Sequence, residues 1–530
     1  MGTGAMAHGG LREPGRPCSP DNFLGTKKYP VWDWLFSGLC KLLNVAVLPM
    51  SARLPVQAKS PFHLDTRPLT EMSSSHAGLL ATSRAFRALK LPDLIEANLS
   101  LKLRKRGFSE AQFIESLLLL QTAGGDCPED IQLLHSDACL VRGLGFSLPK
   151  VSAIRTFLDR FHDDEVADLR PSREQQKSFI LPSTSAVGAL QEVQAGLVAR
   201  VAKLYGQQNL ALHIATIDQD ATIIESHKRS ALPHYEGGRG YQPMVAVWAE
   251  ADLVLADEFR DGNVPARQEP VNCARLAFAA LPSTVRERYF RGDSACHENE
   301  LIGWLRHPDR EKESGGRIGF AISALMSRGL EQALAGVKDS EWKTFGTEAD
   351  GTLRQWADVD YVPTDSTEKK DSQPLRYVGL RLLKPQGVLF ADGSDRHHHA
   401  VVTNLPWAGD RLLKWHREKA GTVEHVHDEV KNALAGGHMP SQHFAVNAAW
   451  FKLALMAYNL ASATKGLCFS AEERTMRFKR YRLSVVNLAG RMSRYANTLR
   501  LRLCASAEAI ARIQRIWEVF SLPTQARAEK

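Results

Sequence analysis

The chain contains few cysteines, and no two of them form a C-x-x-C pair. Eight cysteines are scattered over 530 residues. Disulfide frameworks and structural zinc sites both depend on closely spaced sets of cysteines, so this distribution argues against both classes. We therefore expect a protein of the reducing cytoplasm.

Long uninterrupted apolar runs are also missing. The most apolar stretch near the N-terminus, residues 31–50, is interrupted by Asp33 and Lys41 and follows a leader rich in glycine and proline. A membrane-spanning helix requires roughly 20 consecutive apolar residues. We predict a short helix at 31–50, no association with a membrane, and a poorly ordered extension over residues 1–60.

Acidic residues are absent from a region near the C-terminus. No Asp or Glu occurs between Arg474 and Arg502, although aromatic residues are interspersed there. The net charge is +8, and positive charge concentrated in one segment indicates a polyanion-binding surface more strongly than net charge does. The alternative is an ordinary solvated face of a hairpin or helix. The basic residues are Arg474, Arg477, Lys479, Arg480, Arg482, Arg491, Arg494, Arg500 and Arg502.

The rest of the chain divides by its apolar periodicity. Residues 61–205 have apolar spacings of three and four, which predict a helical domain. Residues 206–330 predict an antiparallel meander followed by mixed strands and helices, the first part of an α/β core. Residues 331–400 alternate as strands do and predict a β-rich insertion. Residues 401–465 would complete the core with a helix, and 466–530 form the basic C-terminal segment.

Three acidic residues in this frame suggest a shared metal site. Asp220 lies in a strand-like run, Asp293 follows another, and Glu424 lies in a segment with helical spacing. Two strand acids and one helix acid can form an oxygen-ligand cage for two magnesium ions over a phosphodiester. Singly, Asp293 could cap a helix near Glu298, and Asp218 or Asp220 could be a turn acid. Their order along the chain favours the shared site.

The segment around Glu424 suggests phosphate contacts as well. Arg417, Glu424 and Lys431 recur every seven residues, about two helical turns, and are predicted to share one face of a single helix. That face could approach the strand acids, with Lys431 and Arg417 beside the substrate phosphates. An ordinary solvated helix face is the alternative.

Three longer blocks resemble a known family. TIDQDATIIESHKR, RGDSACHENELIGWL and WHREKAGTVEHVHDEVKNALAGGHMPSQHFAVNAAWFKLALMAYNL are similar to bacterial insertion-sequence transposases of the DDE type, in the branch containing insertion-sequence family thirteen-eighty. The resemblance covers roughly residues 62–520. It implies an RNase H-like mixed-sheet catalytic core, interrupted by the β-rich insertion and preceded by a helical domain that binds the DNA ends.

The resemblance also implies roles for individual residues. Asp220, Asp293 and Glu424 match the catalytic, metal-binding acids, with Asp218 as the competing first ligand. Lys431 matches the lysine of a Y-(2)-R-(3)-E-(6)-K signature. Its tyrosine and arginine positions are Arg417 and Ala420 in this chain, so that Arg417 or Lys419 would compensate. In the insertion, Trp342 or Trp356 could stack on a flipped base. The expected DNA contacts are Lys431, Arg417, Arg239, Arg260, Arg480 and Arg482.

The activity implied is cleavage at terminal inverted repeats followed by strand transfer into target DNA. The expected cofactor is a pair of Mg²⁺ ions, for which Mn²⁺ can substitute, and the expected partners are double-stranded DNA and a second copy of the chain in a synaptic dimer. Two other classes share some of these features. One is a noncatalytic DNA-binding protein derived from a transposase, and the other is an RNase H-like, structure-directed nuclease.

Overall fold

A computed structural model of the protein describes residues 64–67, 71–102, 106–175, 177–363, 374–496 and 498–521. The predicted extension at 1–60, including the helix at 31–50, lies outside these ranges. Residues 69–530 form one compact unit. Within the described ranges, no helix has the length and apolar character needed to cross a membrane.

A nine-stranded mixed sheet forms the centre of this unit. Its strand order is β10-β11-β12-β13-β9-β8-β2-β6-β7. The meander β2-β6-β7 is antiparallel, whereas β8 runs parallel to β2 and β9 runs parallel to β8. The expected mixed α/β core of RNase H-like type is therefore confirmed. Its strands are β2 (Ile214–Ala221), β6 (Met244–Trp248), β7 (Leu253–Glu258), β8 (Glu287–Gly292) and β9 (Ile318–Ser323).

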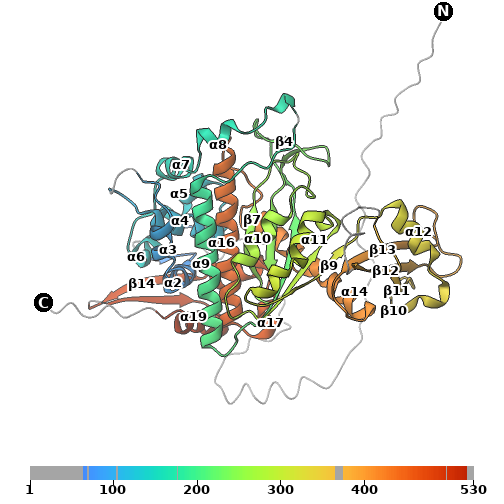
Figure 1. Cartoon of the computed structure of the whole chain (residues 1–530). Helices are drawn as coiled ribbons and strands as arrows, with labels where there is room; N and C mark the ends of the chain where they lie inside the picture. The colour runs from blue at the N-terminus through green and yellow to red at the C-terminus, as the bar shows by residue number, and fades with distance from the viewer. Residues whose placement is uncertain are drawn as a thin grey trace, which may run out of the picture. The chain divides into compact units, whose positions relative to one another are not determined.

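The residues predicted as an insertion form strands that continue the core sheet. Three residue pairs join β13 to β9 in antiparallel register, from Val401 opposite Ser323 to Thr403 opposite Ala321. The insertion is therefore attached to the core sheet along a strand edge (Figure 1). Its elements are α12 (Arg328–Gly336), β10 (Lys343–Thr347), β11 (Leu353–Val359), β12 (Arg376–Leu383) and β13 (Arg396–Thr403).

The region predicted to be helical is helical. Its longest helix, α9, packs with the long helix α16 (Phe444–Cys468) against β7, and the two helices lie side by side in Figure 1. Nearly every residue of α16 is buried, which explains its apolar character on all sides. The helices are α2 (Leu79–Ala88), α3 (Leu91–Asn98), α4 (Glu110–Ala123), α5 (Ile131–His135), α6 (Ala138–Leu144), α7 (Val151–Asp159), α8 (Asp164–Asp168) and α9 (Ser185–Gln207).

The predicted single helix face carrying Arg417, Glu424 and Lys431 is wrong. Arg417 ends one helix, α14 (Gly409–Arg417), and a short 3-10 turn (Glu418–Gly421) separates it from α15 (Val423–Ala433), which carries the other two residues. The hydroxyl of Thr422 at this break donates to Asp218. A tertiary hydrogen bond thus fixes the break, and the seven-residue spacing does not align Arg417 with Glu424.

Smaller elements complete the unit. Helices α10 (Val271–Ala279) and α11 (Asn299–Arg306) follow β7 and β8, and the short strands β3 (Ile224–Glu225), β4 (Leu232–Pro233) and β5 (Arg239–Tyr241) form a small sheet after β2. The basic C-terminal region forms the hairpin β14 (Ala489–Tyr495) and β15 (Thr498–Cys504), with β1 (Ser73–Ser74) paired to β14. It also contains α17 (Ala471–Arg474), α18 (Phe478–Tyr481) and α19 (Ala507–Val519).

Candidate active site

Two of the three predicted acids lie side by side at the ends of neighbouring parallel strands. The register of β2 and β8 pairs Gln219 with Gly292, so Asp220 and Asp293 occupy the next step along each strand. The carboxylate of Asp293 accepts a hydrogen bond from the backbone N–H of Ala295, 3.1 Å away. Burial raises the pKa of Asp293, and the neighbouring negative charge of Asp220 raises this pKa further.

Asp218, the competing first ligand, is in a different environment. Its side chain is fully buried. Its oxygen atoms Oδ1 and Oδ2 lie 2.6 and 2.8 Å from Nε and Nη2 of Arg291, and the Thr422 hydroxyl also donates to it. Both carboxylate oxygens are therefore engaged inside the protein. This geometry favours Asp220, which is only partly buried, as the acid that faces a ligand.

Lys419 lies closest to the pair of acids. Its Nζ is 3.1 Å from Oδ2 of Asp220, and the side chain is almost completely buried. Burial alone would lower the pKa of Lys419, but the charges of Asp220 and Asp293 outweigh this effect and the pKa is raised. The ammonium group therefore balances two carboxylates that would otherwise repel each other. The sequence indicated Lys419 only as a substitute for a missing arginine.

Glu424 reaches the same region from a helix. It is exposed in the first turn of α15, and it lines a groove of about 650 Å³ together with Asp293 and Lys419. Among the described residues its carboxylate makes no hydrogen bond or ion pair, and no three His, Cys, Asp or Glu side chains of that part are arranged to hold a metal ion. Asp220 does not line this groove. The metal-ligand assignment of all three acids thus stays a prediction.

The chemistry of these donors nevertheless suits a hard divalent cation. Carboxylate oxygens are the ligands that Mg²⁺ and Mn²⁺ prefer. Asp220 and Asp293 are adjacent, and the ammonium group of Lys419 contacts Asp220 and is stabilised by the charges of both acids. Glu424 lies on the rim of the adjoining groove with its carboxylate free. The three acids therefore fit the expected cofactor by donor type.

Two histidines lie near the acids, of which His427 is buried and His416 is partly buried. His416 shares a hydrogen bond with the carbonyl of Gly292, the residue before Asp293, with an Nε2 to O distance of 3.1 Å. Burial lowers the pKa of His416 to about 4. Burial likewise lowers the pKa of His427 on α15 to about 4. Both imidazoles are therefore neutral at neutral pH, and His416 can hold the backbone that carries Asp293 as an N–H donor.

We predict that this burial makes the stability of the protein fall at acidic pH. Below the ordinary histidine pKa near 6.5, the unfolded chain binds protons that the folded chain does not bind until about pH 4. The stability that the neutral imidazole contributes is thus fully present above pH 6.5 and is lost as the pH falls towards 4. His416→Gln should flatten the dependence of the urea midpoint on pH between 7 and 5, whereas the exposed His443→Gln should not. An unchanged slope in His416→Gln would contradict the prediction.

Four of the predicted DNA contacts are accessible. Arg480 is exposed, and Arg239 on β5 is partly exposed. Arg417 lines the groove, with its Nη1 3.6 Å from Oε1 of Glu348. Nζ of Lys431 donates to the carbonyl of Ile223 at 3.3 Å, just beyond the strand that carries Asp220. These side chains remain candidates for phosphate contacts.

The other two predicted DNA contacts have guanidinium groups that are engaged within the protein, although Arg482 is partly exposed. Arg260 is fully buried, and its guanidinium binds Glu258 and the carbonyls of Gln268 and Glu269. Arg482 donates to the carbonyls of Thr122, Gln121 and Ala433 at the ends of α4 and α15. Their donors already satisfy buried acceptors, so we assign both a structural role.

The two tryptophans proposed as base-stacking residues are packed within the insertion. Trp342 is 6% exposed, and the guanidinium of Arg381 lies 4.6 Å from its ring centroid. Trp356 packs closely over Gly409, at the start of α14. The ring of Trp342 is thus covered, whereas Trp356 is partly exposed, with Nζ of Lys343 4.8 Å from its ring centroid.

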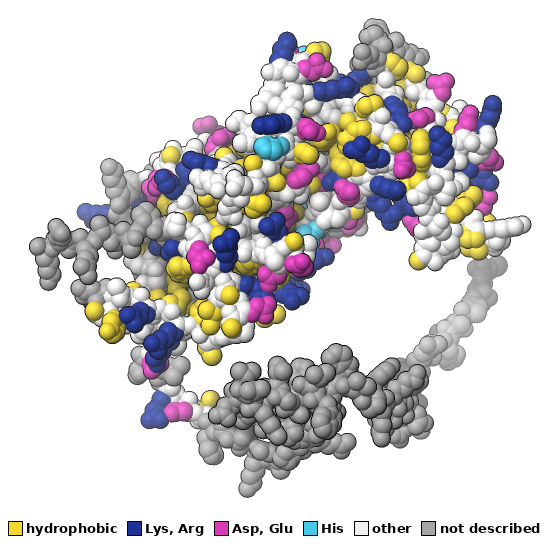
Figure 2. Space-filling model, turned by 90° about the horizontal axis from the view of Figure 1, so that it is seen from below, with side chains coloured by type: hydrophobic (Ala, Val, Ile, Leu, Met, Phe, Trp, Pro, Cys, Tyr) yellow, Lys and Arg dark blue, Asp and Glu magenta, His cyan; other side chains and the backbone are white. Residues whose placement is uncertain are grey.

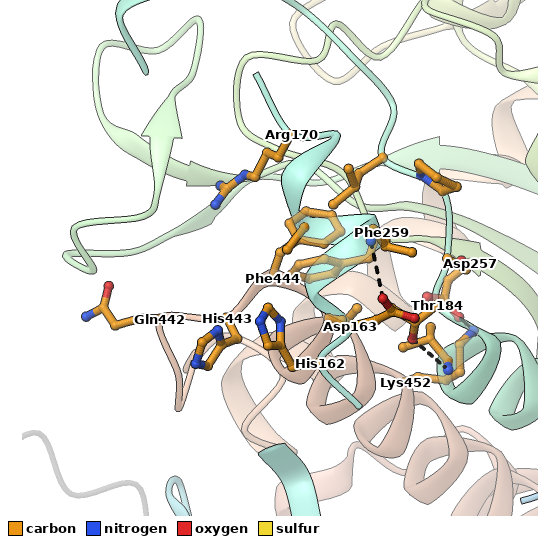
Figure 3. Close-up of a pocket in the computed structure, with 18 residues that line it drawn as sticks. His162, Asp163, Arg170, Thr184, Asp257, Phe259, Gln442, His443, Phe444 and Lys452 are labelled. Atoms are coloured by element: carbon orange, nitrogen blue, oxygen red, sulfur yellow. Dashed lines mark hydrogen bonds and ion pairs between the residues drawn. The ribbon is translucent and has the colours of Figure 1, made fainter. Parts of the chain in front are cut away.

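A second cavity lies between α8, β7 and the start of α16 (Figure 3). Its volume is about 140 Å³, and none of the predicted site residues lines it. The two cations in its wall are paired: Lys452 donates to Asp257 and Gln191, and Arg170 binds Asp261. The rings of His162 and His443 lie 4.0 Å apart between their centroids. The pairing indicates that these charges join the helical region to the core.

Charge on the surface is mixed over most of the face shown in Figure 2. Lys and Arg side chains alternate there with Asp and Glu side chains and with apolar patches. Many of the described cations take part in ion pairs, including Arg155 with Glu129 and Arg376 with Asp358. Exposed cations without acidic neighbours therefore indicate a polyanion-binding surface more strongly than positive charge alone does.

Comparison with known proteins adds a family relationship. The family described as transposase DDE domain group 1 matches residues 69–522. No curated protein matches the sequence. Among solved structures, the chain is similar to a piggyBac transposase in a synaptic complex with hairpin DNA, at 11% sequence identity and a TM-score of 0.37. That alignment covers 86% of this chain and 87% of the other.

Proposed function

The chain belongs to the DDE transposase family, and on this premise we propose that it cuts DNA at the terminal inverted repeats of an insertion sequence and joins the freed ends to target DNA. The observation that carries this proposal is the adjacency of Asp220 and Asp293 at the ends of two parallel strands, beside a groove lined by Glu424. We propose these three acids as the catalytic residues.

The acids are proposed to hold two Mg²⁺ ions, with Mn²⁺ as a substitute. When bound, such ions activate the attacking oxygen and stabilise the leaving 3′ oxygen. Lys419 balances the charge of Asp220 and Asp293 before a metal arrives. His416 fixes the backbone before Asp293, and Lys431 and Arg417 are placed to contact substrate phosphates.

Cutting and joining can use one site because both reactions displace an oxygen at phosphorus. Water attacks the phosphodiester at the element end, the bond to the 3′ oxygen breaks, and that oxygen leaves as a 3′-OH. This 3′-OH then attacks a target phosphodiester and forms a new bond while a target 3′ oxygen leaves. No covalent bond to the protein is required. The first hydrolysis removes one phosphodiester bond, and the joining step forms one phosphodiester bond for each one that it breaks.

Recognition of the repeats is proposed for the helical region before the core, with Arg239 and Arg480 as further phosphate contacts. A homodimer would bring the two ends together, and the setting would be the bacterial cytoplasm. The two other classes make different predictions. A structure-directed nuclease would cut without paired repeats, and a noncatalytic relative would bind the ends without cutting.

The test uses supercoiled plasmids that carry the inverted repeats flanking the encoding gene. We expect the full chain with Mg²⁺ to nick at the repeat ends and to produce joined products only when two repeats are present. Equal cutting of plasmids with two repeats, one repeat or none would favour the structure-directed nuclease. Binding to the repeats without any cutting in Mg²⁺ or Mn²⁺ would favour the noncatalytic protein.

A further inference from the structure

The hairpin of β14 and β15, residues 489–504, concentrates exposed positive charge. Neither strand contains an acidic residue. Arg494, Arg500 and Arg502 are exposed and form no ion pair with the described residues. Arg491 pairs with Glu71 on the segment before β1. The hairpin thus presents three arginines whose counter-charge must come from outside.

The register places two of these arginines on one face of the hairpin. Arg491 lies opposite Arg502, Ser493 opposite Arg500, and Tyr495 opposite Thr498. Side chains at opposing positions share a face, so this face carries Arg491, Arg500, Arg502 and Tyr495. Like charges directly opposite each other destabilise a sheet. A polyanion bound to this face would relieve that repulsion.

The opposite face anchors the base of the hairpin. Met492 is buried against Gly143, and Gly490 packs on Ala77. β1 pairs with β14 at Arg491 and Gly490, and the backbone N–H of Met492 donates to the carbonyl of Met72, so the residues from Ser493 to Tyr495 extend beyond that pairing. Figure 1 shows β14 reaching away from the neighbouring helices. Because its base is fixed and its far end is accessible, the hairpin can insert into a groove of a partner molecule.

The far end carries an aromatic ring supported by an arginine. Tyr495 is 62% exposed, and the guanidinium of Arg500 lies 4.0 Å from its ring centroid. This contact orders both side chains on the same face. Together they present a flat, cationic and aromatic surface, which suits contact with sugar, phosphate and base edges.

We propose that this hairpin inserts into the major groove of the duplex DNA on which the protein acts, with Arg500 and Arg502 on phosphates of the groove walls. The major groove is about 12 Å wide and admits a two-stranded β-ribbon. Only the nature of the partner rests on the proposed function. The charge of the hairpin, the shared face of its arginines and its exposed far end are observed in the described residues.

The charge part of the proposal is tested by the salt dependence of DNA binding. The full chain is compared with Arg500→Gln/Arg502→Gln on a duplex that carries the inverted repeat flanking the encoding gene. Each phosphate contact contributes about 0.9 to the slope of log K against log salt. We expect the slope to become shallower by about 2 and the affinity near physiological salt to fall on the order of tenfold.

A matched variant controls for the loss of two charges. Arg286 and Arg317 are exposed and form no ion pair with described residues, and they precede the parallel strands β8 and β9 at the end opposite Asp293. Arg286→Gln/Arg317→Gln should leave the slope unchanged. Equal slopes for the hairpin variant and the wild type would overturn the proposal, as would equal loss of slope in both variants.

The groove part is tested by dimethyl sulfate, which methylates guanine N7 in the major groove. We expect the wild type to protect a short set of guanines and the hairpin variant to lose that protection. A shallower slope without lost N7 protection would place the hairpin on the phosphates alone and overturn groove insertion. Hairpin-dependent binding to anionic lipid vesicles with no effect on DNA would also overturn the proposal.

The failure of this proposal can be told from the failure of the proposed function. If the wild type cuts and joins DNA while the hairpin variant binds it with the wild-type slope and protection, only the hairpin proposal falls. If the wild type never cuts but shows hairpin-dependent groove protection, the hairpin proposal holds and the catalytic proposal falls. Urea midpoints of both variants should match the wild type, because all four side chains are exposed.

Discussion

Asp293→Asn is expected to reduce DNA strand cleavage on the order of 10³-fold, the scale on which loss of a preorganised charged group lowers an enzymatic rate. Asparagine has the shape of aspartate and can still accept the hydrogen bond from Ala295. Folding and DNA binding should therefore persist while the negative charge beside Asp220 disappears. The measurement is the single-turnover rate of nicking on the two-repeat plasmid in Mg²⁺.

An aspartate outside the groove controls for the loss of a negative charge elsewhere in the protein. Asp163 also accepts N–H bonds at the start of a helix, those of Glu165 and Val166, but it lines the second cavity instead of the groove. Asp163→Asn should nick at the wild-type rate. Asp220→Asn should show a loss similar to that of Asp293→Asn. Nicking by Asp293→Asn at the wild-type rate would refute the assignment of the catalytic acids.

Local patterns in the sequence predicted much of the core. The alternation around Asp220, the short apolar run before Asp293 and the helical spacing after Glu424 each reflect a property of a few consecutive residues. The strand register then brings Asp220 and Asp293 together because both acids end parallel strands. The nature of the sheet and the adjacency of these two acids therefore followed from local signals and strand order.

The break before Glu424 could not be predicted in the same way. A single helix from Arg417 to Lys431 satisfies the spacing, but the backbone turns at residues 418–422 because Thr422 reaches Asp218 and Lys419 reaches Asp220. These contacts join residues about two hundred positions apart. No local pattern encodes them, so the sequence suggested a helix face where the structure places a buried cation.

The internal hydrogen bonds of Arg260 and Arg482 were the other feature that the sequence did not indicate. Arg260 and Arg482 have the composition of a DNA-binding surface, yet their guanidinium groups satisfy buried carbonyls and a carboxylate. Arginine serves both purposes because it offers five donors and keeps its charge. Only the three-dimensional position of the acceptors distinguishes a structural arginine from one that faces DNA. The same difficulty applied to Asp218 and Asp220, which lie two residues apart on one strand.

The pair of Asp218 and Arg291 provides a stability test of that distinction. Both side chains are almost completely buried, and Arg291 also donates to the carbonyl of Trp415. Arg291→Met should lower the free energy of unfolding by about 3 to 5 kcal/mol, because it leaves a buried carboxylate without its partner. The measurement is the urea unfolding curve, and Arg396→Met, which breaks an exposed pair with Asp395, should leave the midpoint unchanged.

The double variant Asp218→Leu/Arg291→Met decides whether the pair is structural. Replacing both charges with apolar groups removes the unpaired carboxylate, so we expect it to recover much of the stability that Arg291→Met loses. It should also retain DNA nicking at a rate within about tenfold of the wild type, since Asp220 and Lys419 keep their contact. A stable double variant that no longer nicks DNA would instead identify Asp218 as the catalytic ligand. In that case Asp220 would be the acid whose role is to neutralise Lys419.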